Sequence, residues 1–231
     1  MARTGFFHHV GTFLLFAACI LVLITCITAP TVRELSILKV DLGNTAGSDN
    51  GNVAFGTFGY CLNHVQGDRH FCTKAHVGYY PTDVISSIDN TDFSHAARTS
   101  TRALTKVMIL HPIACGIDFL AFVLALGAGV VGSLLASLVA LVGFVVTVVV
   151  LITDFVLFAI VRRHVNHDDT SGAHAHYGPA AWTLLASAVC ALLGTIVVFF
   201  TCCSARLHER HRSSMAVKGD GYPATRRRRW I

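Results

Sequence analysis

Charged side chains are scarce in this sequence: Asp, Glu, Lys and Arg together make up 13% of the 231 residues, whereas 53% are hydrophobic. A soluble domain usually carries about a quarter charged residues. The shortage of charge therefore argues against an ordinary soluble domain. It indicates that much of the chain lies where charge is costly, inside a lipid bilayer.

The sequence also lacks the motifs of common enzyme classes. It has no Ser-His-Asp pattern in a recognisable context, no glycine-rich phosphate-binding loop and no HExxH motif. We therefore expect a protein that is not an enzyme, with no catalytic residues, cofactor or bound metal. The loops expected outside the membrane also contain no Asn-x-Ser/Thr sequon, so N-glycosylation is not predicted.

The apolar residues fall into long blocks, at Val10–Ile27, Val107–Val130, Leu134–Val161 and Ala180–Cys203. Each is close to or above the roughly 20 residues that cross a bilayer as a helix. Because a backbone in lipid must satisfy its own hydrogen bonds, such blocks become helices. The predicted fold is an all-α membrane protein, a four-transmembrane-helix bundle. We expect the first block to stay as a signal anchor, because Pro30 directly follows its small-residue end.

Basic residues set the expected orientation. The C-terminal tail holds eight of them, opposed only by Glu209 and Asp220, and the positive-inside rule puts such a tail in the cytoplasm. Arg162 and Arg163 go against the rule. The expected segments are a cytoplasmic N-terminus 1–9, span 10–29, external loop 30–106, span 107–129, turn 130–133, span 134–161, external loop 162–179, span 180–203 and a basic cytoplasmic tail 204–231.

The first external loop contains strand-like stretches, at 35–42, 53–55 and 76–80, with a Gly/Asn-rich turn cluster between the first two. We expect a small extracellular β-sheet resting on the bundle. Cys61 and Cys72 are the only cysteines in this loop, and an oxidising exterior favours a disulfide between them. The alternatives are two free thiols, or a zinc site with His64, His70 and His76, although no tetrahedral ligand spacing stands out.

Several segments together resemble a known family. Four spans and a G-x-x-G-x-C…C pattern are similar to claudin-like membrane proteins, and the closer likeness is to the fungal pH-response regulator PalI family, whose relatives include eisosome-associated proteins. The motif residues are Phe55, Gly56, Phe58, Gly59 and Tyr60. The other similar segments are HVGY from His76, LTKVMILHPIACGIDFLAF from Leu104, DFVLFAIVRRHV from Asp154 and YGPAAWTLLA from Tyr177.

The resemblance implies a plasma-membrane accessory protein that helps to localise or stabilise a multi-span sensor of ambient alkaline pH. An alternative is a cortical membrane-domain organiser of the eisosome type, or a claudin-like adhesion protein. A third reading is a proton- or ion-coupled transporter. The expected partners are membrane lipids and the pH sensor; a homo-oligomer stays open, and nucleic acid is not expected.

Two acids interrupt the predicted spans, Asp118 in the second and Asp154 in the third. Ionisable residues within a membrane are costly and are functional candidates by default. Both could face the bundle interior and fix helix packing, contact a partner protein or transfer protons. His111-Pro112 is interpreted as a structural start of the second span, because proline is tolerated in the first turn of a helix.

The second external loop is rich in histidine: His164, His167, His174 and His176 occur with Asp168 and Asp169. Histidine ordinarily titrates near pH 6.5, so this loop is a candidate pH-titrating segment. A simply solvated loop, or metal capture by His174 and His176 with an aspartate, are the alternatives.

Two features mark the cytoplasmic side. Cys202 and Cys203 end the fourth span ahead of basic residues, which makes them candidate S-palmitoylation sites or a pair of unmodified thiols. The run Arg226–Arg229 is expected to attract anionic lipid.

Overall fold

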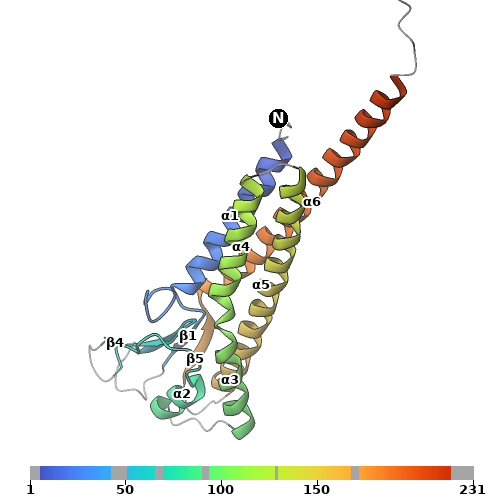
Figure 1. Cartoon of the computed structure of the whole chain (residues 1–231). Helices are drawn as coiled ribbons and strands as arrows, with labels where there is room; N and C mark the ends of the chain where they lie inside the picture. Colours follow the sequence, from blue (N-terminus) through green and yellow to red (C-terminus); the bar gives the residue numbers. More distant parts are fainter. Residues whose placement is uncertain are drawn as a thin grey trace, which may run out of the picture.

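The computed structural model describes residues 6–42, 51–65, 70–89, 94–127, 130–167 and 172–219. Long helices dominate it: α1 Phe6–Cys26, α4 Leu110–Leu126, α5 Val130–Val165 and α6 Pro179–Gly219. They lie side by side in one bundle, with α1 against α4 and α6, and α5 against α4 and α6 (Figure 1). The far end of α6 extends beyond the other helices (Figure 1).

Four segments are long and apolar enough to cross a membrane: Phe6–Cys26, His95–Leu126, Leu134–Val165 and Pro179–Ser204. Their outer surfaces carry large apolar side chains such as Phe119, Leu138 and Leu193. A soluble bundle would bury such side chains, whereas lipid accepts them. The predicted four-span bundle is thus confirmed, and the chain is a multi-pass membrane protein.

A five-stranded antiparallel sheet lies at one end of the bundle, in the order β4-β3-β2-β1-β5. Its strands are β1 Leu38–Asp41, β2 Asn52–Phe55, β3 Tyr60–Asn63, β4 His70–Cys72 and β5 His174–Tyr177. The predicted small sheet is confirmed, including strands at 38–41 and 52–55. Its fifth strand comes from the second loop and pairs with β1, which the strand signals of the first loop alone did not predict.

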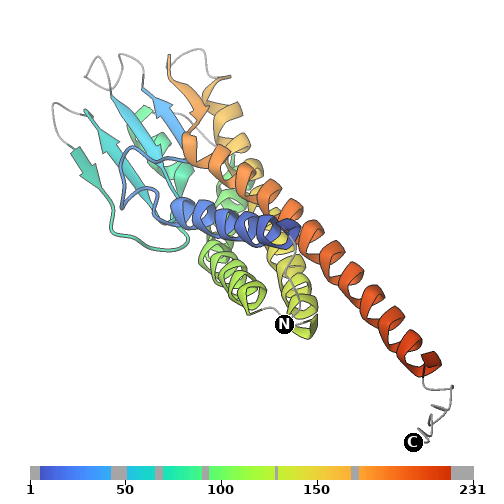
Figure 2. The same cartoon turned by 90° about the horizontal axis from the view of Figure 1, so that it is seen from above.

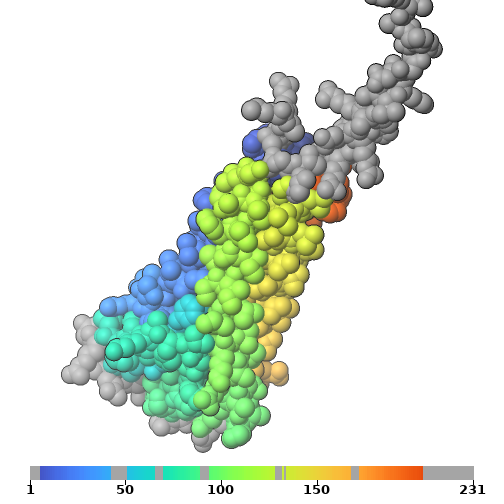
Figure 3. Space-filling view, viewed as in Figure 1, coloured from blue at the N-terminus to red at the C-terminus, as the bar shows by residue number. Residues whose placement is uncertain are grey.

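The sheet has an inner and an outer face. Leu38, Val40 and Phe55 point inward and are fully buried. They share a core with Leu157 and Phe158 of α5. At 36 residues and 1.5 Å per residue, α5 is about 54 Å long, more than a bilayer core of about 30 Å requires. One end of α5 therefore leaves the membrane and supports the sheet, and bundle and sheet form one continuous body (Figure 3).

The predicted strand at 76–80 is wrong. These residues form an extended loop in which Gly78 has φ 81° and the Tyr79 side chain is buried. Two helices that the sequence patterns did not predict follow it, α2 Pro81–Asp89 and α3 His95–Val107. Ser94 caps α3 by accepting a hydrogen bond from the Ala97 amide at 3.3 Å.

The disulfide between Cys61 and Cys72 is confirmed, with sulfurs 2.02 Å apart. It joins directly opposed residues of β3 and β4. The two cysteines are therefore neither free thiols nor zinc ligands.

Candidate functional site

The motif Phe55–Tyr60 is the tight turn between β2 and β3, closed by the Gly56 amide donating to the Gly59 carbonyl at 2.9 Å. Both glycines are pressed against the chain that leaves α1. A Cβ at Gly56 would overlap the Ala29 backbone, and a Cβ at Gly59 would stand 3.1 Å from a Pro30 ring carbon and closer still to the Thr73 hydroxyl. The glycines of the motif are needed because two backbones touch there.

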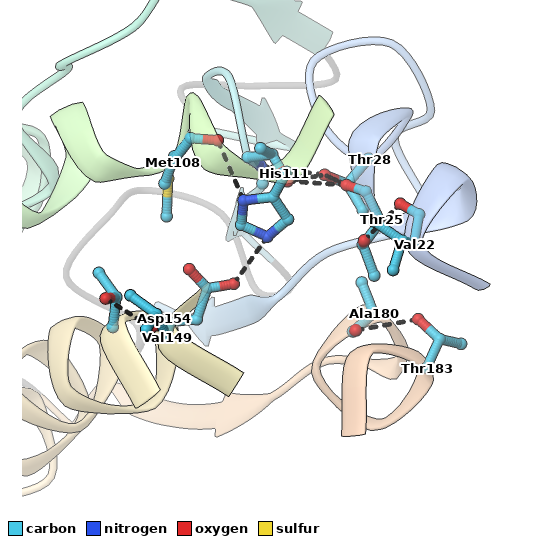
Figure 4. Close-up of polar contacts among 12 residues, drawn as sticks. Val22, Thr25, Thr28, Met108, His111, Val149, Asp154, Ala180 and Thr183 are labelled. Atoms are coloured by element: carbon cyan, nitrogen blue, oxygen red, sulfur yellow. Dashed lines mark hydrogen bonds and ion pairs between the residues drawn. The ribbon is translucent and has the colours of Figure 1, made fainter. Parts of the chain in front are cut away.

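Threonines lock this turn to the end of α1. Thr57 is fully buried. Its amide donates to the Thr28 hydroxyl at 2.9 Å, and its own hydroxyl donates to the Thr25 carbonyl at 2.7 Å. Thr25 and Thr28 lie beside the first turn of α4 (Figure 4). These bonds satisfy buried polar groups, so the turn has a fixed position on the bundle.

Aromatic rings fill the space beneath the turn. The Phe55 and Tyr79 rings stack with centroids 6.4 Å apart, and Tyr60 packs against both. The Tyr79 hydroxyl donates to the Gly56 carbonyl at 2.7 Å. Burial, together with the nearby Asp154 carboxylate, raises the pKa of Tyr79 well above its usual value. Burial also raises the pKa of Tyr60. Phe58 is half-buried at the tip.

A buried polar pair lies where the bundle meets the sheet. His111, in the first turn of α4, is fully buried, and its Nε2 lies 3.1 Å from Oδ2 of Asp154 on α5. The His111 Nδ1 lies 3.0 Å from the Met108 carbonyl (Figure 4). A carbonyl can only accept, so Nδ1 is the donor in this contact. The contact between Nε2 and Oδ2 joins α4 to α5 inside the bundle.

The sequence analysis named Asp154 but not its partner. His111 was interpreted only as part of the start of a helix with Pro112. The missed signal is register: α4 and α5 are antiparallel neighbours, so one facing pair of residues implies others at matched steps along both helices. The register that pairs His111 with Asp154 also pairs Asp118 with Thr147, two turns further along each helix.

Asp118 is 1% exposed and faces Gly143 of α5, where a Cβ would overlap the carboxyl oxygen. Thr147 lies one turn along α5 from Gly143. Among the described residues, neither Asp118 oxygen nor the Thr147 hydroxyl has a partner in hydrogen-bond geometry, although the two side chains are neighbours. A buried Asp118 favours the packing hypothesis over direct contact with a partner protein. Its role stays a prediction.

The predicted histidine loop is divided between two elements. His164 lies in the last turn of α5 and His167 just beyond it. His174 and His176 are exposed on the outer face of β5, where the Nδ1 of His176 lies 3.4 Å from Oδ2 of Asp41. Asp168 and Asp169 lie outside the described residues. The pH-titrating role stays a prediction.

Metal ligands do not converge within the part of the chain that the structure describes: it holds no group of three His, Cys, Asp or Glu side chains that could hold an ion. Cys202 is 3% exposed and turned toward the bundle, whereas Cys203 is half-buried. Cys203 is thus the more accessible of the two candidates for lipidation, which stays a prediction.

Comparisons with known proteins bear on the whole four-helix unit. A sequence model of the SUR7/PalI family matches residues 7–205. The pH-response regulator palI/prr-5 of Neurospora crassa is 29% identical over 152 residues, 63% of this chain and 20% of that protein. The regulator palI/RIM9 of Emericella nidulans is 30% identical over 118 residues, 51% of this chain and 18% of that protein.

A third relative is the uncharacterized membrane protein TOS7 of Saccharomyces cerevisiae, 30% identical over 107 residues, 46% of this chain and 16% of that protein. The chain thus spans a fifth or less of the length of each of these curated relatives.

Proposed function

This chain belongs to the SUR7/PalI family, and on that premise we propose that it is a non-enzymatic accessory protein of a pH-response pathway, which helps to localise or stabilise a multi-span pH sensor at the plasma membrane. The observation that carries the proposal is the similarity of the membrane-spanning part of the chain to proteins named pH-response regulators. The names of these relatives describe regulators, which supports an accessory role for this chain.

The proposed mechanism is binding to the sensor through the spans and the sheet. The spans present large apolar side chains such as Phe119, Leu120 and Leu138. These suit lipid or the helices of another membrane protein. In this proposal the sheet lies outside the cell and both termini are cytoplasmic, because the tail carries the excess of basic residues.

Deletion of the gene tests the proposal. We expect slower growth at alkaline pH and loss of the sensor from the cell surface, both restored by the wild-type chain. The sensor should also co-purify with the tagged chain from detergent-solubilised membranes. Normal sensor placement and normal alkaline growth in the deletion strain would contradict the proposal.

The same strain separates the alternatives. Stable patches formed by the chain alone, with the sensor unaffected, would favour the cortical organiser. Proton flux in liposomes that disappears in Asp118→Asn would favour a transporter. Gly116→Ala provides a matched control on the same helix, because a Cβ there meets no other atom within 4 Å.

A further inference from the structure

A polar pocket of about 440 Å³ lies on the outer face of the sheet, away from the core and from the His111–Asp154 pair. Among the described residues, its charged or titratable lining residues are Arg33, Glu34, Lys39, His64, His70, His176 and Tyr177. They come from the turn after α1, from β1, from the β3–β4 hairpin and from β5. Because segments from residues 33–39, the β3–β4 hairpin and β5 converge on it, the pocket exists only in the folded chain.

The floor of the pocket is an ordered row of side chains across neighbouring strands. The His70 Nδ1 lies 3.3 Å from Oδ1 of Asn63, and the Asn63 amide donates to Oδ1 of Asn52 at 3.0 Å. Since the Asn52 oxygen accepts this bond, its own amide group is turned to donate. The row of side chains thus ends in an amide donor that lines the pocket.

Histidines decide the charge of this surface. Among the described residues, the fixed cations Arg33 and Lys39 are offset by Glu34 in the wall and by Asp41, whose carboxyl oxygens lie 3.4 Å from Lys39 Nζ and from His176 Nδ1. Protonation of His64, His70 and His176 would therefore turn a balanced surface into a cationic one. The remaining titratable neighbours from the described elements are Tyr177 in the wall and His174 beside Asp41 on β5.

The pocket also opens beside two membrane-spanning helices. Arg33 follows α1 closely along the chain, and Pro179 in the opposite wall is the first residue of α6. Gly178 approaches Ser36 so closely that a Cβ would overlap the Ser36 carbonyl, so the two walls meet. Figure 2 shows β5 and the start of α6 beside β1. The pocket thus lies near the membrane surface.

We propose that this pocket binds a phosphate-type oxyanion, and that binding strengthens as its histidines gain protons. Arginine, lysine, protonated histidine and amide donors are the groups that recognise such an anion. The proton dependence follows because the fixed charges cancel. The bound oxyanion is either the headgroup of a lipid at the membrane surface or a soluble ion. The site stands independently of the proposed pH-response role.

The test uses the full chain in nanodiscs of phosphatidylcholine. Sulfate, which keeps its charge between about pH 5.5 and pH 8, isolates the titration of protein histidines. A second set of discs contains phosphatidylglycerol, whose phosphodiester likewise keeps its charge. Binding is followed by the thermal unfolding midpoint and by NMR shifts of the histidine rings. We expect at least about tenfold tighter binding at the lower pH, from added charge-assisted hydrogen bonds.

The variants identify the residues. A chain with His64→Asn, His70→Gln and His176→Gln should lose the pH dependence; asparagine is chosen at 64 because that residue has φ 54°. The matched control His95→Gln, an exposed histidine on α3, should keep it. Arg33→Gln, at an exposed position, should weaken binding at both pH values and remains informative if the triple variant does not fold.

Binding of sulfate supports a soluble ligand, and stabilisation by phosphatidylglycerol alone supports a headgroup. The absence of both at the lower pH would overturn the proposal, as would unchanged pH dependence in the triple variant. The two hypotheses can fail separately. If the purified chain binds the oxyanion as expected while the gene-deletion strain keeps a normal pH response, only the accessory role fails.

Discussion

At the scale of single residues, several positions are packed so closely against their neighbours that a substitution cannot be accommodated without a shift of the surrounding atoms. Gly56 lies against the Ala29 backbone, and the buried Nε2 of His111 lies 3.1 Å from Oδ2 of Asp154. Interiors are packed at crystal-like density, so such positions respond strongly to one added or removed group.

Gly56→Ala should destabilise the protein by about 3 kcal/mol, the upper part of the range for overpacking, because the new methyl overlaps main-chain atoms that cannot rotate away. Gly116→Ala is the control, since its Cβ would meet no neighbouring atom; it should stay within about 1 kcal/mol of wild type. Unfolding of the purified protein in detergent micelles measures both. Equal stability of the two variants would contradict the prediction.

His111→Ala should cost about 3–5 kcal/mol, because it strands a buried carboxylate without its partner. Adding Asp154→Asn should recover part of that loss, since no charge is then left buried. A double-mutant cycle in micelles gives the coupling, with His95→Ala as the exposed control. Strictly additive effects of the two changes would show that the pair does not interact.

Tyr79→Phe should cost about 1 kcal/mol by removing the hydrogen bond to the Gly56 carbonyl. Folding raises the pKa of Tyr79, so the unfolded chain releases the tyrosine proton at a lower pH than the folded chain does. The contribution of this group to the free energy of unfolding is therefore complete below its unfolded pKa of about 10, and it is lost as the pH rises further. The variant should lose less stability than wild type between about pH 9 and pH 11. Tyr80→Phe, which changes a more exposed ring, is the control. The measurement is the free energy of unfolding as a function of pH, and parallel curves for the wild type and Tyr79→Phe would contradict the prediction.

At the scale of elements, a side chain at the end of α5 ties that helix to β5. The Asn166 side-chain amide donates to the Ala175 carbonyl at 3.1 Å, and the Ala175 backbone amide donates to Oδ1 of Asn166 at 2.7 Å. These bonds support β5 at the edge of the sheet, where its pairing with β1 brings His176 to Asp41.

Asn166→Ala should therefore loosen β5 selectively. We expect faster amide hydrogen exchange at Ala175 and little change in β2 and β3, whose pairing does not involve this side chain. The neighbouring exposed His167→Ala is the control. Uniform loss of protection across the sheet would mean that β5 and the other strands open together instead.

At the scale of the whole molecule, the distribution of charge predicts which side of the membrane carries the sheet. By the positive-inside rule, a cytoplasmic basic tail would put the sheet outside, and this orientation is a prediction. Asp92→Ser creates an Asn-Thr-Ser sequon that begins at Asn90, within the first loop. In a eukaryotic host we expect glycosylation of this variant, seen as a mass shift removed by endoglycosidase; a sequon added at the C-terminus should stay unmodified. Glycosylation of the tail sequon alone would show the opposite orientation in the membrane.

Much of this architecture can be predicted from composition and pattern. Four apolar blocks required four spans, because lipid leaves an exposed backbone no other way to satisfy its hydrogen bonds. Two cysteines alone in one loop pointed to the disulfide that is found. The glycines and aromatics of FGTFGY carried the resemblance to a family to which the chain belongs.

The remaining features depend on contacts between residues far apart in the chain, which local patterns do not encode. The 76–80 stretch has a strand-like composition, but the Tyr79 side chain is buried under the motif and the segment forms a loop. The contact between His111 and Asp154 depends on the packing of two antiparallel helices, and the pairing of β5 with β1 depends on the assembly of the sheet. Local chemistry decided which segments enter lipid; the tertiary structure decided which polar groups inside and beside the membrane meet, because each buried group needs a partner that only packing can supply.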